Sequence, residues 1–277
     1  MAQSVFFDSQ IVTRVSDGIV PESFWKEVIE RLAGKYEYCV SFTTLMELVN
    51  ALAGGDENHF QQNRNRLLVM TSPAKCRFLP MPGQFIRNTI FGLPLDRPEY
   101  SPERLQQRWM PIIRRALNKQ DLSSGGVVMG SLAKGIDLTF GIDLGMLRKY
   151  MEDGKKLWGE ELRLAKNGEK EMPPPELHAT FILRFNVYAL ETQENVERLS
   201  RALDAAYCHL AQIHHASTRS VYRFDKNLQD WIDNQQLMYL ADPELTFVTA
   251  DKRLIAKLAK SKDRGRVREF TEFAKAI

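Results

Sequence analysis

Residues 245–251, Leu-Thr-Phe-Val-Thr-Ala-Asp, indicate the fold most clearly, because they form an apolar run rich in β-branched residues that ends in an acid. Short runs of this kind are typical of strands that are buried on both faces of a sheet. Residues 5–8, Val-Phe-Phe-Asp, repeat the pattern near the other end of the chain. We therefore predict strands at Leu245–Thr249 and Val5–Phe7, each followed closely by an aspartate.

Helices are predicted to alternate with strands in the first part of the chain. Pro21–Leu32 is expected to be helical, because proline suits a first helical turn and apolar residues recur on one side. Tyr38–Phe42 is predicted as the next strand, after which Thr43 or Thr44 caps a helix that the glycines at 54–55 stop. This alternation is the pattern of a parallel α/β sheet.

The last third of the chain returns to the same alternation. Glu191–Ala216 is predicted as one long helix, and Asn227–Ala241 as a helix that precedes the strand at 245–249. A basic helix, Lys252–Lys262, is expected to follow that strand, and Val267–Phe273 to add a last strand or a helical turn.

The middle of the chain loses the alternation, because prolines interrupt its first half and glycines its second half. We predict a single α/β domain of 277 residues, with a core formed by residues 1–90 and 181–277. Residues 91–180 are predicted to be a mostly helical insertion that packs against this core.

The composition is that of a globular protein, with 44% hydrophobic and 26% charged residues. The formal net charge of +3 neither requires nor forbids a nucleic-acid partner. The three cysteines are far apart and include no CxxC pair, which argues against a disulfide framework or a thiolate zinc site and favours a reducing compartment. Neither a signal peptide nor an apolar stretch of roughly 18 residues is visible, so we expect a cytoplasmic protein without a membrane partner.

Asp8 and Asp251 occupy equivalent places, because each follows a predicted strand. In open parallel sheets, functional groups gather at the carboxyl ends of the strands. Two carboxylates at one sheet edge repel each other unless a cation lies between them, and Mg²⁺ and Mn²⁺ prefer carboxylate oxygen. Taken singly, either aspartate also fits a structural role, since aspartate after a strand commonly caps the next helix.

Glu47 and Asp233 each have a structural explanation beside a functional one. Thr44-x-x-Glu47 matches a capping box, and the helical position of Glu47 places it either in solvent or at the rim of a cleft. Asp233 lies opposite Trp231 on the predicted helix, where a surface position is the default. Asp230 competes with Asp233 for the same role.

Four segments of the chain together resemble the motifs of PIN-domain ribonucleases and occur in the order of that family. They are Val5-Phe-Phe-Asp8-Ser, Ser41-Phe-Thr-Thr-Leu-Met-Glu47-Leu, Asp233-Asn-Gln-Gln-Leu-Met-Tyr-Leu-Ala241 and Phe247-Val-Thr-Ala-Asp251-Lys. The family pattern is an Asp after the first strand, a Glu in the second helix, an Asp that starts a late helix and an Asp after the fourth strand. The resemblance covers the two ends of the chain, and typical members are shorter and lack such an insertion.

The resemblance implies a PIN-like three-layer domain in which Asp8, Glu47, Asp233 and Asp251 bind Mg²⁺ or Mn²⁺, with the Thr249 hydroxyl supporting the last acid. It also implies an endoribonuclease, in which a metal-bound water attacks the phosphodiester and no nucleophilic side chain is needed. An acid that binds no metal could serve as the base towards that water. RNA is the expected substrate, while DNA, a protein regulator and a homodimer partner stay open.

Basic side chains near the acids are the candidates for contacts to the phosphate backbone. Lys252 and Arg253 directly follow Asp251, and Arg108, Arg114 and Arg115 form a basic stretch in the insertion. Charged faces of this size are usually only solvated.

Three histidines are not predicted to be metal ligands. His209, His214 and His215 lack the i, i+4 spacing that places two ligands on one helical face, so we predict that they lie on a helix surface or at a core edge. Two alternatives to the nuclease hypothesis remain. One is a catalytically weak PIN-like scaffold that contacts RNA or a protein, and the other is an unrelated α/β protein in which the four acids never meet.

Overall fold

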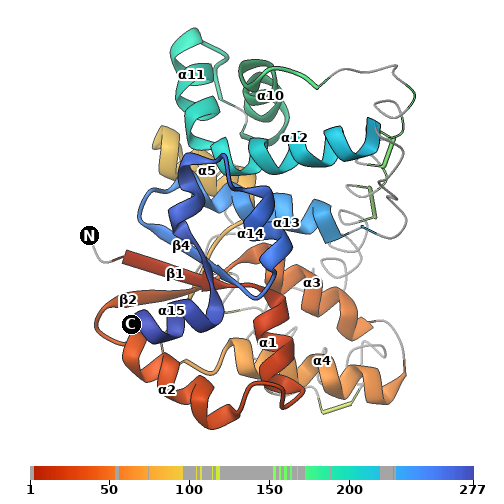
Figure 1. The fold of residues 1–277 in the computed structure, drawn as a ribbon, viewed down its shortest axis with the longest axis vertical. Coiled ribbons are helices and arrows are strands. Elements are labelled where there is room, and N and C mark those ends of the chain that lie inside the picture. Colours follow the sequence, from red (N-terminus) through yellow and green to blue (C-terminus); the bar gives the residue numbers. More distant parts are fainter. Residues whose placement is uncertain are drawn as a thin grey trace.

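The computed structural model contains a five-stranded sheet whose strands all run parallel, with helices on both faces (Figure 1). It describes residues 3–53, 56–73, 75–95, 172–187, 189–218, 227 and 229–277, together with single positions between 104 and 167. The strands are β1 (Gln3–Phe7), β2 (Tyr36–Val40), β3 (Arg77–Phe78), β4 (Leu245–Thr249) and β5 (Val267–Glu269). The predicted α/β class with a central parallel sheet is therefore confirmed.

The helices of the first part of the chain are α1 (Ser9–Ser16), α2 (Glu22–Leu32), α3 (Phe42–Ala53), α4 (Glu57–Met70) and α5 (Pro82–Phe91). Those of the later part are α10 (Pro175–Ile182), the π-helical turn η2 (Leu183–Val187), α11 (Gln193–Ala202), α12 (Asp204–Thr218), α13 (Gln229–Leu237), the 3₁₀ helix η4 (Met238–Ala241), α14 (Lys252–Lys257), the 3₁₀ helix η5 (Lys262–Arg266) and α15 (Phe270–Ala276).

The sheet separates two apolar cores, because successive side chains of a strand point to opposite faces. Phe7 and Val248 belong to the core that includes residues of α1–α4 and α15, whereas Phe6 and Phe247 belong to the core that includes residues of α5, α10, α11 and α14. The rings of Phe6 and Phe247 stack at 4.8 Å between their centroids. Figure 1 shows the same division into three layers, with α1, α2 and α15 on one side of the sheet and α5, α10, α11 and α12 on the other.

The strand order is β3-β2-β1-β4-β5, so the sheet grows in one direction from β1 to β3 and in the other from β4 to β5. β1 pairs with both β2 and β4, and Phe7 is level with Val248 in the register of β1 and β4. In open parallel sheets, the crevice beyond the carboxyl ends of the strands at such a reversal is the usual place for a ligand. In this sheet, that place lies next to the residues that follow β1 and β4.

Several predicted boundaries differ from those observed. The predicted strand Tyr38–Phe42 is β2 at Tyr36–Val40, because Phe42 already belongs to α3. The basic helix Lys252–Lys262 ends at Lys257. The helix Asn227–Ala241 is α13 followed by the tighter turn η4.

The predicted long helix Glu191–Ala216 is wrong, since the chain forms two helices that meet at Leu203. Asp204, the first residue of α12, accepts hydrogen bonds from the Ser261 hydroxyl at 2.6 Å and from the Lys262 backbone at 2.9 Å. These contacts tie the start of α12 to a segment far along the chain, which local periodicity does not reveal.

Most of the predicted insertion, residues 91–180, lies outside the described residues. Its expected C-terminal limit falls inside α10, which contributes Ala179 and Ile182 to the second core. Among the described residues, no helix combines the length and the apolar character that a membrane crossing requires.

Candidate metal centre at the ends of β1 and β4

Asp8 directly follows β1 and begins α1 as its N-cap residue. Its Oδ1 accepts hydrogen bonds from the Gln10 backbone N–H and the Ser9 hydroxyl, both at 3.3 Å. The side chain is almost completely buried, with 2% of the residue exposed. The helix-capping role expected for an aspartate after a strand is therefore present, and it occupies only one of the two carboxylate oxygens.

The second oxygen of Asp8 connects the two central strands. The Thr249 hydroxyl donates a hydrogen bond of 2.6 Å to Asp8 Oδ2 and accepts one of 3.0 Å from the Asp251 backbone N–H. Thr249 was expected to support Asp251, and its oxygen does contact that residue, but its proton is directed to Asp8. One buried hydroxyl thus ties together two segments that are 241 residues apart in the chain.

Asp251 is the N-cap residue of α14, where its Oδ1 accepts from the backbone N–H groups of Arg253 at 2.7 Å and Leu254 at 3.1 Å. Its charge contributes to raising the pKa of Asp8, so the two carboxylates are within electrostatic reach of each other. Both aspartates therefore cap the helix that follows their strand, and their charges interact.

A pocket of about 360 Å³ brings three of the four predicted acids to one surface. Its lining contains Asp8 from the end of β1, Glu47 from α3 and Asp233 from α13. Asp233 is half-buried, so it lies in the wall of this pocket and is not fully exposed. The pocket also contains Gln229, Arg14 and Arg66, three polar groups that the sequence analysis did not single out.

Glu47 does not close a capping box with Thr44. The helix begins earlier, at Phe42, and the Thr44 backbone N–H donates to the Ser41 hydroxyl at 3.1 Å. Glu47 instead accepts a hydrogen bond of 2.7 Å from the Gln229 side chain, 182 residues along the chain. Of the two positions left open for Glu47, the cleft rim is therefore the observed one.

The charged forms of Asp8 and Asp233 are disfavoured by burial and by the neighbouring negative charges. Burial raises the pKa of Asp8, although the hydrogen bonds from Thr249, Gln10 and Ser9 lower it in part. The pKa of Asp233 is raised well above its ordinary value, first by burial and then by the negative charges of Asp8, Asp230 and Asp251. A bound cation would favour the charged forms of these groups.

The donor set fits a hard divalent ion. The four predicted acids offer carboxylate oxygens, which are the ligands that Mg²⁺ and Mn²⁺ prefer. Asp8, Asp233 and Asp251 interact electrostatically, while Asp8, Asp233 and Glu47 share one pocket. Asp8, Glu47 and Asp233 therefore line one pocket, and Asp251 acts on Asp8 and Asp233 through its charge, but among the described residues these four acids do not form a compact ligand group of the kind that His209, Asp230 and Asp233 form.

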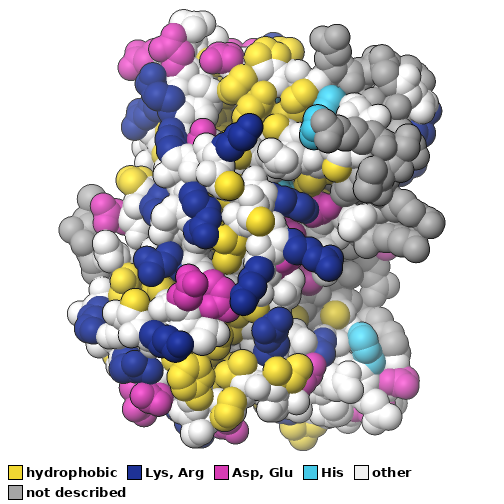
Figure 2. Space-filling model, viewed as in Figure 1, with side chains coloured by type: hydrophobic (Ala, Val, Ile, Leu, Met, Phe, Trp, Pro, Cys, Tyr) yellow, Lys and Arg dark blue, Asp and Glu magenta, His cyan; other side chains and the backbone are white. Residues whose placement is uncertain are grey.

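The basic residues predicted to contact the phosphate backbone lie in different parts of the structure. Lys252 and Arg253 are exposed on the first turn of α14, next to Asp251. Arg114 is exposed. Its charge lowers the pKa of the Cys76 thiol, but burial raises that pKa by more. Arg108 and Arg115 lie outside the described residues. Figure 2 shows Lys and Arg side chains spread over the face that carries α1 and α14, with acidic side chains between them.

His209 differs from its predicted place on a helix surface or core edge, since none of its surface is exposed. It lies on α12 and approaches Asp230 on α13. His214 is half-buried and His215 is exposed, as expected for a helix surface.

Comparison with protein-family models, with curated proteins and with solved structures found no match.

Proposed function

We propose that the protein is a PIN-like endoribonuclease that depends on Mg²⁺ or Mn²⁺. One observation carries the proposal: Asp8 and Asp251 follow the two strands at which the sheet order reverses, and the Thr249 hydroxyl joins them. The pocket beside Asp8 is completed by Glu47 and Asp233, the other two acids of the PIN-like motifs. The order of the four motifs and the parallel sheet support the PIN-like assignment.

Each acid would act as a ligand that the fold holds in place. Asp8 is oriented by Thr249, and Glu47 is oriented by Gln229. Asp233 is one turn into α13, and Asp251 is fixed by the first turn of α14. A divalent ion bound by these groups would supply an activated water and charge stabilisation for phosphodiester hydrolysis.

Basic groups surround the acids and suit a polyanionic substrate. Arg14 and Arg66 line the pocket, and Lys252 and Arg253 are exposed beside Asp251. Such side chains would neutralise phosphates on either side of the cleaved bond. RNA is the proposed substrate, and the three cysteines, which form no disulfide, are compatible with action in the reducing cytoplasm.

The test is cleavage of a labelled single-stranded RNA in the presence of Mn²⁺ and of EDTA. We expect Mn²⁺-dependent cleavage by the wild type and a loss of at least about a hundredfold in Asp8→Asn, because the loss of one ligand carboxylate removes several kcal/mol of charge stabilisation. Glu194→Gln neutralises an exposed acid on α11 and should leave the rate unchanged.

Three outcomes would contradict the nuclease: no cleavage by the wild type with Mn²⁺, cleavage that survives in Asp8→Asn, and an equal loss in Glu194→Gln. RNA binding by the wild type without cleavage would support the PIN-like scaffold instead. A parallel assay with single-stranded DNA of the same sequence establishes whether the sugar matters.

A further inference from the structure

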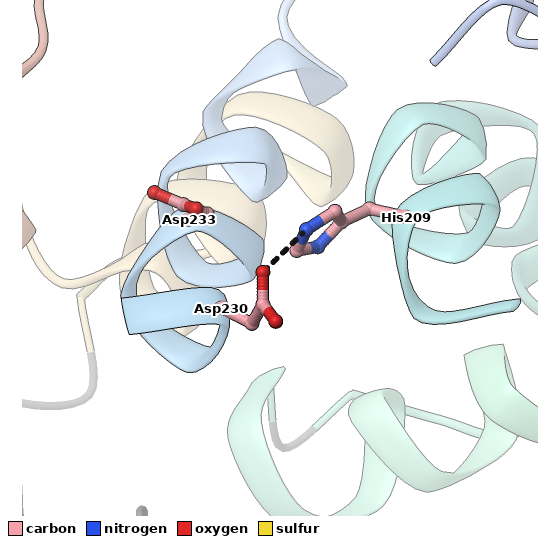
Figure 3. Close-up of side chains that lie close together, drawn as sticks. All are labelled: His209, Asp230 and Asp233. Carbon is pink, nitrogen blue, oxygen red and sulfur yellow. Dashed lines mark ion pairs between the residues drawn. The ribbon is translucent and has the colours of Figure 1, made fainter. Parts of the chain in front are cut away.

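His209, Asp230 and Asp233 form a compact group between two packed helices. His209 projects from α12, and the two aspartates lie one turn apart on α13, with Asp230 directed towards the imidazole (Figure 3). The Asn234 side chain donates a hydrogen bond of 2.8 Å to the Ala206 carbonyl and so joins the same two helices nearby. The group therefore lies where α12 and α13 pack against each other.

Within the described part of the chain, His209 has no hydrogen-bond partner, which is unusual for a buried polar side chain. None of its surface is exposed, and neither ring nitrogen makes a hydrogen bond with the described residues. Its Nε2 lies 3.6 Å from Asp230 Oδ1, which is too long for a hydrogen bond. Buried polar groups are almost always hydrogen-bonded, and a bound ion is one of the few explanations for an exception.

The geometry points to a second metal site, in which His209, Asp230 and Asp233 bind a divalent transition-metal ion such as Zn²⁺. One potential ligand atom from each residue lies within 4.8 Å of the other two. Ligands around a tetrahedral ion with bonds of about 2.0–2.2 Å are ~3.5 Å apart, so a modest inward rotation of the side chains closes the site. An imidazole nitrogen beside carboxylates favours such ions over Mg²⁺.

The charges around the group agree with a role as ligands. Burial lowers the pKa of His209, with the nearby Asp230 carboxylate opposing this effect, and neutral imidazole is the form that binds metals. Asp233 also lines the pocket with Asp8 and Glu47. Under the proposed function it would therefore stand between the two sites, but the histidine site itself does not depend on nuclease activity.

The ammonium group of Lys257 would compete with a metal ion for the Asp230 carboxylate. Its Nζ lies 2.5 Å from Asp230 Oδ1, the same oxygen that faces His209. A metal ion that binds Asp230 through this oxygen must displace the ammonium group or share the carboxylate with it. Replacing Lys257 by a neutral residue should therefore strengthen metal binding, whereas a purely structural His–Asp–Lys cluster would only lose an ion pair.

The test is a titration with Co²⁺, an absorbing substitute for Zn²⁺, in the wild type and in Asp8→Asn, which removes a ligand of the proposed carboxylate site but none of the three ligands of this site. We expect one Co²⁺ per chain with a visible absorption band, weakened about tenfold or more in His209→Gln and in Asp230→Asn. His215→Gln, on the exposed side of the same helix, should change nothing. Lys257→Gln should bind several-fold more tightly.

The absence of Co²⁺ binding by the wild type would overturn the site. So would an unchanged affinity in either folded variant, as judged by circular dichroism, and Asp230→Asn serves if His209→Gln does not fold. Asp8→Asn should keep the Co²⁺ signal even though it loses RNA cleavage. Failure of the nuclease and failure of this site are thus seen in different measurements.

Discussion

The two groups of acids in this protein are held by different kinds of structure. Asp8 and Asp251 are placed by the backbone pairing of β1 with β4 and by the Thr249 hydroxyl, so their relative position is fixed by the register of the sheet. His209 and Asp230 meet only because the sides of α12 and α13 pack together. We call the Asp8/Asp251 site strand-built and the His209/Asp230 site helix-built. Changes that disrupt the strand-built site should therefore destabilise the whole fold, whereas changes at the helix-built site should have only local effects.

The largest effect is expected when the strand pair itself is weakened. Phe247 is completely buried in β4 and stacks on Phe6, so Phe247→Ala should destabilise the protein by about 3–5 kcal/mol. Asn234→Ala, which removes the side-chain link between α12 and α13, should cost only about 1 kcal/mol. Urea denaturation followed by circular dichroism measures both. Equal losses in the two variants would refute the distinction between the strand-built and the helix-built site.

A smaller effect is expected at the hydroxyl that joins the two strand ends. Thr249→Val keeps the shape of the buried side chain but removes both the donor to Asp8 and the acceptor for the Asp251 N–H. We expect a loss of about 1–3 kcal/mol in the free energy of unfolding, because buried polar groups are left unsatisfied. Thr249→Ser retains the hydroxyl and should recover most of the stability lost through its removal. If Thr249→Val were as stable as Thr249→Ser, the hydrogen bonds of the Thr249 hydroxyl would contribute nothing to the free energy of unfolding.

The mildest effect concerns Asp233, the residue common to both groups. Its folded-state pKa is raised, so between its ordinary pKa and the raised value the folded state binds more protons than the unfolded state, and stability falls as pH rises. Without metal, Asp233→Asn should therefore be more stable than the wild type at neutral pH, and the difference should shrink as pH falls towards the ordinary value. Thermal melts across pH measure this.

Added Mn²⁺ should reverse that order, because only the wild type keeps this carboxylate for the ion. An ion at a hundred times its Kd stabilises a protein by about 2.7 kcal/mol. If Mn²⁺ stabilised the wild type and Asp233→Asn equally, Asp233 would not be a ligand.

The sequence predicts β1 and β4 well because each is a short apolar run, and the aspartates that follow them are visible without a structure. α4 was not predicted, since its surface is largely polar and its four buried residues give a weak pattern. The start of α3 differs from the prediction because Ser41, Thr43 and Thr44 are all good caps, and in the structure the Ser41 hydroxyl accepts the hydrogen bond from the Thr44 backbone N–H.

The approach of His209 to Asp230 could not be predicted from helical periodicity. Spacing within one helix reports which side chains share a face of that helix, while this contact joins two helices and involves residues 21 positions apart on separate elements. Similarly, Gln229 contacts Glu47 across 182 positions. Both contacts follow from tertiary packing, for which the single sequence offers no local signal.

The pairing of β1 with β4 has a consequence for synthesis of the chain. β1 lies in the middle of the sheet, yet its partner β4 is translated more than 230 residues later. Until then, a nascent chain can pair β1 only with β2, and the other edge of β1 offers unpaired backbone groups to passing strands. Asp8 therefore cannot meet Thr249 until the 241 residues that separate them have been synthesised, and the acidic centre stays incomplete until then.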